Sequence, residues 1–191
     1  MRNILMTKYA LLAAGLGLAL VGQAQADEYW EYGDWRVQIT DEDTGEGYRR
    51  YCSARTGGDG LPVIALEVSD GDAGPPTVYP QPMYQESAPR GHRTAIGNAQ
   101  GVAFVFDRQG SFFAVADGGV DGEGFAYVTA EPRWQDAKNM LLWMQYASQM
   151  EVLALDAYQA STQVYVASLS GFTAAYGKMM DSCGFTLEIP R

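Results

Sequence analysis

The sequence predicts a mainly β fold, α+β by a loose count: an antiparallel β-sandwich or a small barrel, with two short helices near the C-terminus. Two observations lead to this prediction. About eight short segments alternate apolar and polar residues, and turn residues separate them at hairpin spacing. Apolar residues change to a helical spacing only in the last third of the chain.

The first half of the chain predicts strands only. Alternation over residues 35–40 predicts a strand, which turn residues 41–47 join to a second strand over residues 48–55. Residues 61–71 contain a third strand. The next stretch is rich in proline, which predicts loop with one edge strand around Thr77–Tyr79.

A second hairpin and the first helix follow. Residues 102–106 and 111–116 flank the turn at 107–110, and residues 124–132 predict a further strand. An amphipathic helix is then predicted by apolar residues at helical spacing, with Asp136 as its N-cap. The apolar stripe consists of Ala137, Met140, Leu141, Met144 and Ala147.

The C-terminal part predicts two strands, a second helix and a last strand. The strands are residues 151–158 and 161–169, and the last strand is Gly184–Pro190. The helix runs over Gly171–Ser182, with Ser170 as its cap. Its apolar stripe contains Phe172, Ala175, Tyr176, Met179 and Cys183.

Residues 1–26 are typical of a secretory signal peptide. Arg2 and Lys8 form a basic start, Ala10–Gly22 is an uncharged apolar run, and Ala24–Ala26 supplies the small residues that signal peptidase requires. The run has about 13 residues, short of a bilayer-spanning helix, which favours cleavage over an uncleaved anchor. We therefore expect a single β-rich domain over residues 27–191, periplasmic or secreted, and not integral to the membrane after cleavage.

The chain is acidic, with 23 acidic and 13 basic residues and a formal net charge of −10. Cleavage would remove the two positive charges of Arg2 and Lys8, which changes −10 to −12. Nucleic acids and anionic membrane surfaces attract basic proteins, so neither is an expected partner. The expected partner is a protein or an envelope component of unknown identity.

The two cysteines, Cys52 and Cys183, predict a disulfide rather than two buried thiols. An exported chain enters an oxidising compartment, and an even number of cysteines there favours a disulfide. The bridge would enclose about 130 residues, which the chain-entropy model values at about 4–5 kcal/mol. The sequence has no C-x-x-C motif, which argues against a catalytic dithiol.

No residue is assigned a catalytic role. His92 is the single histidine, so a serine or cysteine triad would require it, but Arg90 and Arg93 disfavour a further positive charge there. No G-x-S-x-G motif occurs, and Ser168–Phe172 lacks its first glycine. We expect His92 on a surface loop.

No metal or cofactor site is expected either. One histidine and a paired cysteine set argue against zinc. The acidic runs at 41–46 and 117–123 lack the ligand order of an EF-hand, and their Asp and Gly residues are typical of tight turns. The glycines form neither a P-loop nor a dinucleotide-binding motif.

The alternative function is an envelope hydrolase or a carbohydrate-active enzyme that uses paired carboxylates. With 23 acidic residues an accidental pair is common, so the sequence selects none. Aromatic side chains fit either a sugar-binding face or a β core, and core use is commoner. The tryptophans concerned are Trp30, Trp35, Trp134 and Trp143.

Two segments resemble the invasion-associated locus B family of exported alphaproteobacterial proteins. Residues 137–179 match the family's order of helix, strand, turn, strand and helix, with "SLSGF" at Ser168–Phe172, and "YGDWRV" at Tyr32–Val37 matches its opening strand. The chain departs from the family at Ile39, where members carry a cysteine, and at Tyr176, where they carry leucine. It is closer to a cousin group that keeps only an early and a final cysteine.

The resemblance implies an exported protein without established catalytic activity, and a part in host-cell association for some members. We therefore predict a non-enzymatic domain that binds a protein or cell-envelope partner.

Overall fold

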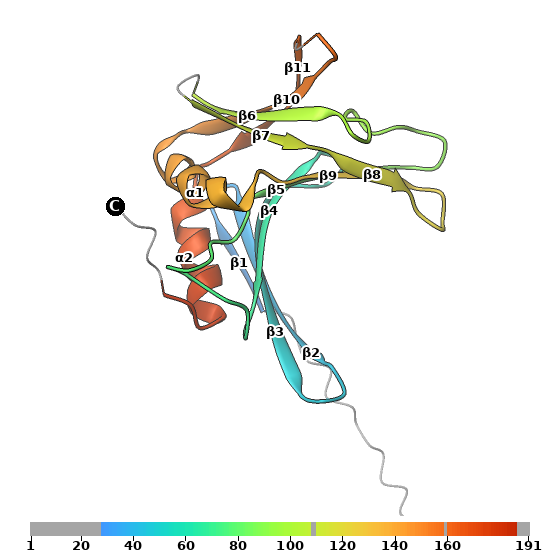
Figure 1. Ribbon diagram of the computed structural model, residues 1–191. Helices are drawn as coiled ribbons and strands as arrows, with labels where there is room; N and C mark the ends of the chain where they lie inside the picture. Colours follow the sequence, from blue (N-terminus) through green and yellow to red (C-terminus); the bar gives the residue numbers. More distant parts are fainter. Residues whose placement is uncertain (1–27, 108–109, 159, 187–191) are drawn as a thin grey trace, which may run out of the picture.

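The structure is a computed structural model that describes residues 28–107, 110–158 and 160–186 (Figure 1). Within these residues, eleven strands form two open antiparallel sheets, and two α-helices follow the ninth and eleventh strands. This confirms the mainly β prediction in its β-sandwich form, because neither sheet closes into a barrel in the described part of the chain. The predicted signal peptide and residues 187–190 of the predicted last strand lie outside the described residues. Residues 184–186, the described part of that predicted strand, form no strand.

The larger sheet contains seven strands. In spatial order they are β1 (Glu28–Tyr32), β2 (Trp35–Asp43), β3 (Tyr48–Gly57), β4 (Val63–Ser69), β5 (Met83–Ala88), β9 (Ala126–Ala130) and β8 (Asp117–Val120). The smaller sheet contains β11 (Ser161–Ser168), β10 (Gln149–Leu155), β6 (Gly101–Phe106) and β7 (Gly110–Val115). The helical elements are η1 (Trp134–Asp136), α1 (Ala137–Tyr146) and α2 (Phe172–Ser182).

The two sheets and both helices share one hydrophobic core. Alternate residues of the strands point into it, as the period-two pattern predicts. Full burial of each large apolar side chain stabilises the fold by about 1.5–3 kcal/mol. The fully buried large side chains include Trp35, Ile64, Leu66, Tyr84, Phe104, Phe106, Met140, Leu141, Phe172 and Tyr176.

Three strands were not predicted: β1, β5 and β8. In β5 only Tyr84 and Ala88 are buried, so the segment shows no alternation, and prolines stand on both sides of it. Residues 77–79, predicted as an edge strand, form no strand. In β8 the sequence is Asp-Gly-Gly-Val, and Gly118 lies so close to β9 that an added Cβ would be 2.6 Å from the Tyr127 carbonyl oxygen.

Helix α1 buries the predicted face, but its predicted cap is wrong. Ala137, Met140, Leu141 and Met144 are its buried residues. Asp136 occupies the N-cap position without a side-chain capping bond. Its carboxylate instead accepts a hydrogen bond from Arg133 Nε at 3.0 Å.

Helix α2 likewise buries its predicted stripe and begins differently. Its N-cap is Gly171 in the left-handed region (φ 90°), with no side-chain capping bond. Ser170 is therefore not the cap. Its carbonyl oxygen accepts a hydrogen bond from the Asp34 N–H at 3.0 Å, which assigns it to a contact with the β1–β2 turn.

The β1–β2 turn and the β11–α2 turn pack directly against each other. Ser168 Oγ donates to Asp34 Oδ2 at 2.6 Å, and Trp35 Nε1 donates to the Ser168 carbonyl oxygen at 3.0 Å. The indole of Trp35 then contacts the Phe172 ring edge to face, with 5.0 Å between ring centroids. The two segments that carry the sequence resemblance, "YGDWRV" and "SLSGF", are thus in contact.

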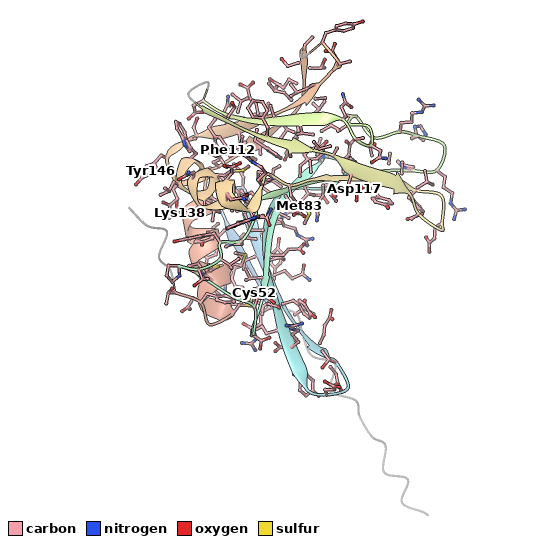
Figure 2. The ribbon with its side chains drawn as sticks, viewed as in Figure 1. Cys52, Met83, Phe112, Asp117, Lys138 and Tyr146 are labelled. Atoms are coloured by element: carbon pink, nitrogen blue, oxygen red, sulfur yellow. A yellow bond between two sulfur atoms is a disulfide. The ribbon has the colours of Figure 1, made fainter. Side chains whose placement is uncertain are left out.

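A disulfide joins the end of α2 to the larger sheet. Cys52 on β3 is bonded to Cys183, 131 residues later, and their Cα atoms are 6.1 Å apart. Figure 2 shows Cys52 beside α2. The bond and the turn contact hold opposite ends of α2 against β1–β3.

The turn contact predicts a large cost for Gly171→Ala. An added Cβ would lie 1.7 Å from the Tyr32 carbonyl oxygen, and an L-residue at φ 90° is strained. We expect a loss of at least ~2 kcal/mol in the free energy of unfolding, measured by chemical denaturation. Gly91→Ala is the matched control, because Gly91 has φ 79° and open space around it. Equal losses in the two variants would contradict the close packing of the turns.

Two buried tyrosines predict opposite effects of removing a hydroxyl. Burial raises the pKa of both Tyr84 and Tyr176, so both stay protonated. Tyr84 donates to Glu86 Oε2 at 2.8 Å, whereas the Tyr176 hydroxyl has no hydrogen-bond partner among the described residues. Tyr176→Phe should therefore raise the free energy of unfolding by about 1 kcal/mol, and Tyr84→Phe should lower it by about as much. Similar destabilisation by both changes would refute this difference.

Candidate functional site

No triad was assigned from the sequence, and the structure places the residues that were weighed for one, His92 and the serines of Ser168–Phe172, in a loop and a turn. His92 is exposed in the loop between β5 and β6, where its backbone N–H donates to the Pro89 carbonyl oxygen. Ser168 belongs to the turn before α2 and donates to Asp34. Asp34 thus has a hydroxyl partner, but neither residue is hydrogen-bonded to an imidazole. The arrangement positions two turns and does not activate a nucleophile.

The acidic segments serve turns and strand pairing. Asp41 forms a bidentate pair with Arg50 across β2 and β3, at 2.7 and 2.8 Å. Asp43 accepts the Gly45 N–H, and Asp121 accepts the Glu123 and Phe125 N–H groups. Among the described residues, no three His, Cys, Asp or Glu side chains gather in a way that would hold a metal ion.

Three of the four tryptophans are engaged in packing. Trp35 is fully buried, Trp143 lies beside Phe106, and Lys178 Nζ sits 3.9 Å from the ring centre of Trp30. Trp134 in η1 differs, because 66% of it is exposed. The tryptophans therefore do not form a common sugar-binding face.

A groove along β7 combines exposed apolar side chains with charged groups. We call it the β7 groove. Its volume is about 710 Å³. One wall is β7 itself, the edge strand of the smaller sheet, and the other is the segment from the end of β9 to η1. The lining residues are Ser111, Phe112, Phe113, Ala114, Val115, Glu131, Arg133 and Asp136.

The groove lies where the pairing of β9 with β8 ends and is not continued along β7. Only Ala116 lies between β7 and β8, and β8 pairs with β9 up to Asp117 and Thr129. Continued pairing would place Glu131 opposite Val115, but β9 ends at Ala130. Pro132 has no N–H to donate, and its carbonyl oxygen accepts a bond from Gln81 Nε2 at 2.7 Å. The second wall is thereby bonded to the segment that precedes β5.

The side chains of β7 alternate between core and solvent. Phe112 lies on the side nearest α1 and packs against Phe106, with ring centroids 5.9 Å apart (Figure 2). Phe113 and Val115 point outwards and are 58% and 69% exposed. Single exposed apolar residues are common on proteins. These two lie together on a strand edge that lines a groove and that no strand in the described part of the chain covers.

The charged wall of the groove is net negative. Arg133 Nε is 3.0 Å from Asp136 Oδ2, so these two charges are paired. Glu131 is exposed and has no hydrogen bond or ion pair to the described residues. An acid catalyst of the paired-carboxylate type needs a carboxyl group in an apolar, desolvated setting. Glu131 is open to solvent and Asp136 is paired with Arg133, so neither carboxyl group lies in such a setting.

Two further depressions lie on the larger sheet, and two of the polar side chains that line the first are bonded to neighbouring residues. The one across β2, β3 and β4 has a volume of about 460 Å³ and includes Gln38 and Asp72. Gln38 Oε1 accepts from Arg55, and Asp72 accepts from the N–H and hydroxyl of Ser69. The second, of about 370 Å³, is formed by the proline-rich loop and the end of α2.

Sequence reasoning located the hairpin of β6 and β7 but not the groove. The signal was the pattern "SFFAV", in which only one of two adjacent phenylalanines can face the core. Whether the second phenylalanine is covered depends on which strands pair with β7. The sequence pattern does not predict that pairing.

Neither helix in the described ranges is long enough to cross a bilayer, since α1 has 10 residues and α2 has 11.

No protein-family model matches the chain, and no curated protein matches it by sequence. Among solved structures, the chain is similar to the crystal structure of invasion associated protein B from Bartonella henselae. The two share 9% sequence identity and superpose with a TM-score of 0.49, over 81% of this chain and 97% of that chain. Family membership therefore stays a prediction from the sequence.

Asp107 predicts a pH-dependent anchor for the β6–β7 hairpin. It accepts the Ser148 N–H at 2.8 Å and the Ser148 hydroxyl at 3.0 Å, and these bonds lower the pKa of its carboxyl group. A lowered folded-state pKa stabilises the fold above the unfolded pKa of about 4, and this stabilisation is lost as pH falls through the folded pKa. Asp107→Asn should therefore reduce stability at pH 7 more than at pH 3, measured by urea unfolding.

Glu123→Gln, at an exposed position in the β8–β9 turn, is the control for removal of one negative charge. A stability difference for Asp107→Asn that does not change between the two pH values would contradict the anchor.

Proposed function

We propose that this chain is an exported, non-enzymatic domain that binds a protein or cell-envelope partner through the β7 groove. The observation that supports it is the pair Phe113 and Val115. They are exposed on a strand edge that lines a groove and pairs with none of the described strands. Burial of these side chains by a partner would remove apolar surface from water, which favours association.

The free edge of β7 lacks the features by which proteins usually prevent strand pairing. Lysines, prolines, bulges and short length commonly protect edge strands. Strand β7 is Gly-Ser-Phe-Phe-Ala-Val, six residues without a charge or a proline. An edge of this kind fits a surface that a partner covers.

Export is supported by the signal-peptide features of residues 1–26 and by the disulfide. Disulfides persist in oxidising compartments such as the periplasm and the extracellular space. The Cys52–Cys183 bond therefore fits a periplasmic or secreted protein.

We also propose distant membership of the invasion-associated locus B family, on the strength of the two sequence segments. The contact between "YGDWRV" and "SLSGF" gives these motifs a common structural purpose. Trp35 and Asp34 donate to the carbonyl oxygens of Ser168 and Ser170, and Asp34 accepts from the Ser168 hydroxyl. The proposal carries over no role in invasion.

A hydrolase is the second candidate, because Glu131 and Asp136 line one groove on either side of the exposed Trp134. If the protein is a hydrolase, the purified protein should turn over peptidoglycan or a glycan. Glu131→Gln and Asp136→Asn should each abolish this turnover. Turnover that survives both changes would remove the groove from consideration as an active site.

The binding proposal predicts a position-specific contact in cells. A photo-crosslinking amino acid at Phe113 should give a discrete adduct upon irradiation, because this side chain is 58% exposed in the groove. Tyr158, 92% exposed in the β10–β11 turn, is the control position and should give none. Denaturing electrophoresis followed by mass spectrometry of the adduct measures the outcome. Adducts at both positions, or at neither, would contradict a partner at the β7 groove.

A further inference from the structure

We infer that the β7 groove takes an extended peptide segment as an added strand, and that this segment alternates apolar and basic residues. The inference rests on the proposed function and specifies the chemistry of the partner. Strand addition at a sheet edge uses main-chain hydrogen bonds for affinity and alternate side chains for specificity.

The backbone of β7 presents its free donors and acceptors to the groove. The Ala116 N–H donates to the Gln100 carbonyl oxygen at 2.9 Å, at the end of the β6–β7 pairing. In an antiparallel pair, hydrogen-bonded residues alternate with residues whose N–H and C=O point the other way. Continued along β7, this alternation bonds Phe112 and Ala114 to β6 and directs the polar groups of Ser111, Phe113 and Val115 away from it.

The groove has the length of a short strand. The lining residues of β7 run without a break from Ser111 to Val115. Five residues of strand span about 17 Å, at about 3.3–3.4 Å per residue. The strand geometry is already in place, since β9 pairs with the continuation of β7 and then leaves it. An incoming segment would occupy the position that β9 vacates.

The added strand should alternate two kinds of residue, because its successive side chains face opposite sides of the sheet. A residue directly opposite Phe113 or Val115 lies on the outer face of the sheet, within side-chain contact of them, so an apolar residue fits there. The intervening residues of the added strand point to the opposite face of the sheet, the face of Phe112 and Ala114. These two residues line the groove together with Glu131, Arg133 and Asp136.

Charge selects basic residues for the intervening positions. The carboxylate of Glu131 is unpaired among the described residues, and the Arg133–Asp136 pair adds no net charge to the wall. The whole chain has a formal charge of −10, which favours the approach of a basic segment. A second copy of this chain would bring the same negative charge and an uncharged β7, so it fits less well.

The test uses synthetic peptides of seven residues that alternate valine and lysine. The purified mature protein should bind this peptide saturably by isothermal titration calorimetry, with shifts at the Ser111, Phe113 and Val115 amides in NMR spectra. A peptide in which glutamate replaces lysine should bind at least tenfold more weakly. So should a peptide of the same composition in which the valines and lysines form two blocks.

Backbone methylation supplies the sharpest comparison. In the proposed register, the valine amides face β7 and the lysine amides face away. N-methylation of the valine amides should weaken binding at least tenfold, because it removes the donors to β7, whereas N-methylation of the lysine amides should leave it unchanged. The protein is unaltered in this comparison, so misfolding plays no part. Equal effects of the two methylations would overturn strand addition.

Protein variants test the site. Phe113→Ala should weaken binding at least tenfold, and Tyr127→Ala, an exposed position on β9 outside the groove lining, should not. Equal binding of the glutamate peptide would overturn the basic partner. Dimerisation of the free protein that Phe113→Ala abolishes, measured by analytical ultracentrifugation, would identify a second copy as the occupant and would also overturn the inference.

The two proposals fail in distinguishable ways. Adducts at Phe113 in cells without binding of the alternating peptide would overturn this inference and leave the proposed function in place. Absence of both would overturn both.

Discussion

The contact between the β1–β2 turn and the β11–α2 turn determines how the rest of the molecule is arranged. It joins residues more than 130 positions apart, through the bonds from Trp35 and Asp34 to Ser168 and Ser170. The glycines in both turns are required, because a Cβ on either Gly33 or Gly171 would meet the backbone of the other turn. With this contact in place, α2 lies across β1, β2 and β3, Phe172 covers Trp35, and Cys183 reaches Cys52.

Sequence patterns predicted those elements whose residues alternate or repeat in a way that burial enforces. The stripe of α1 and the stripe of α2 are buried as predicted, because a helix on a core has one apolar face. Strand β5 was missed, since pairing with β4 and β9 keeps it in the sheet although few of its residues face the core. The caps at Asp136 and Ser170 were wrong. The Asp136 carboxylate accepts a bond from Arg133 instead, and Gly171, not Ser170, occupies the N-cap position of α2.

The candidate site is a property of topology, which explains why no motif marks it. Residues 110–115 belong to the smaller sheet and residues 117–120 to the larger one, so a nearly continuous strand is shared between them. It pairs with β6 along its first part and with β9 along its second. Neither β6 nor β9 pairs along the whole of this strand. The part that does not pair with β9 lines the groove at residues 111–115. Sheet edges of this kind are where specific strand pairing and unwanted aggregation compete, so their residues are constrained by both.

The two turns in contact are far apart in the sequence, and this affects the order in which parts of the chain can fold. The first strands cannot gain the cover of α2 until residues 168–183 have followed them, which is nearly the whole described chain. Contacts of such high sequence separation form late, because loop closure costs entropy before the contacts repay it. For the export proposed above, such late closure would leave the first strands without the cover of α2 until nearly the whole described chain has been made.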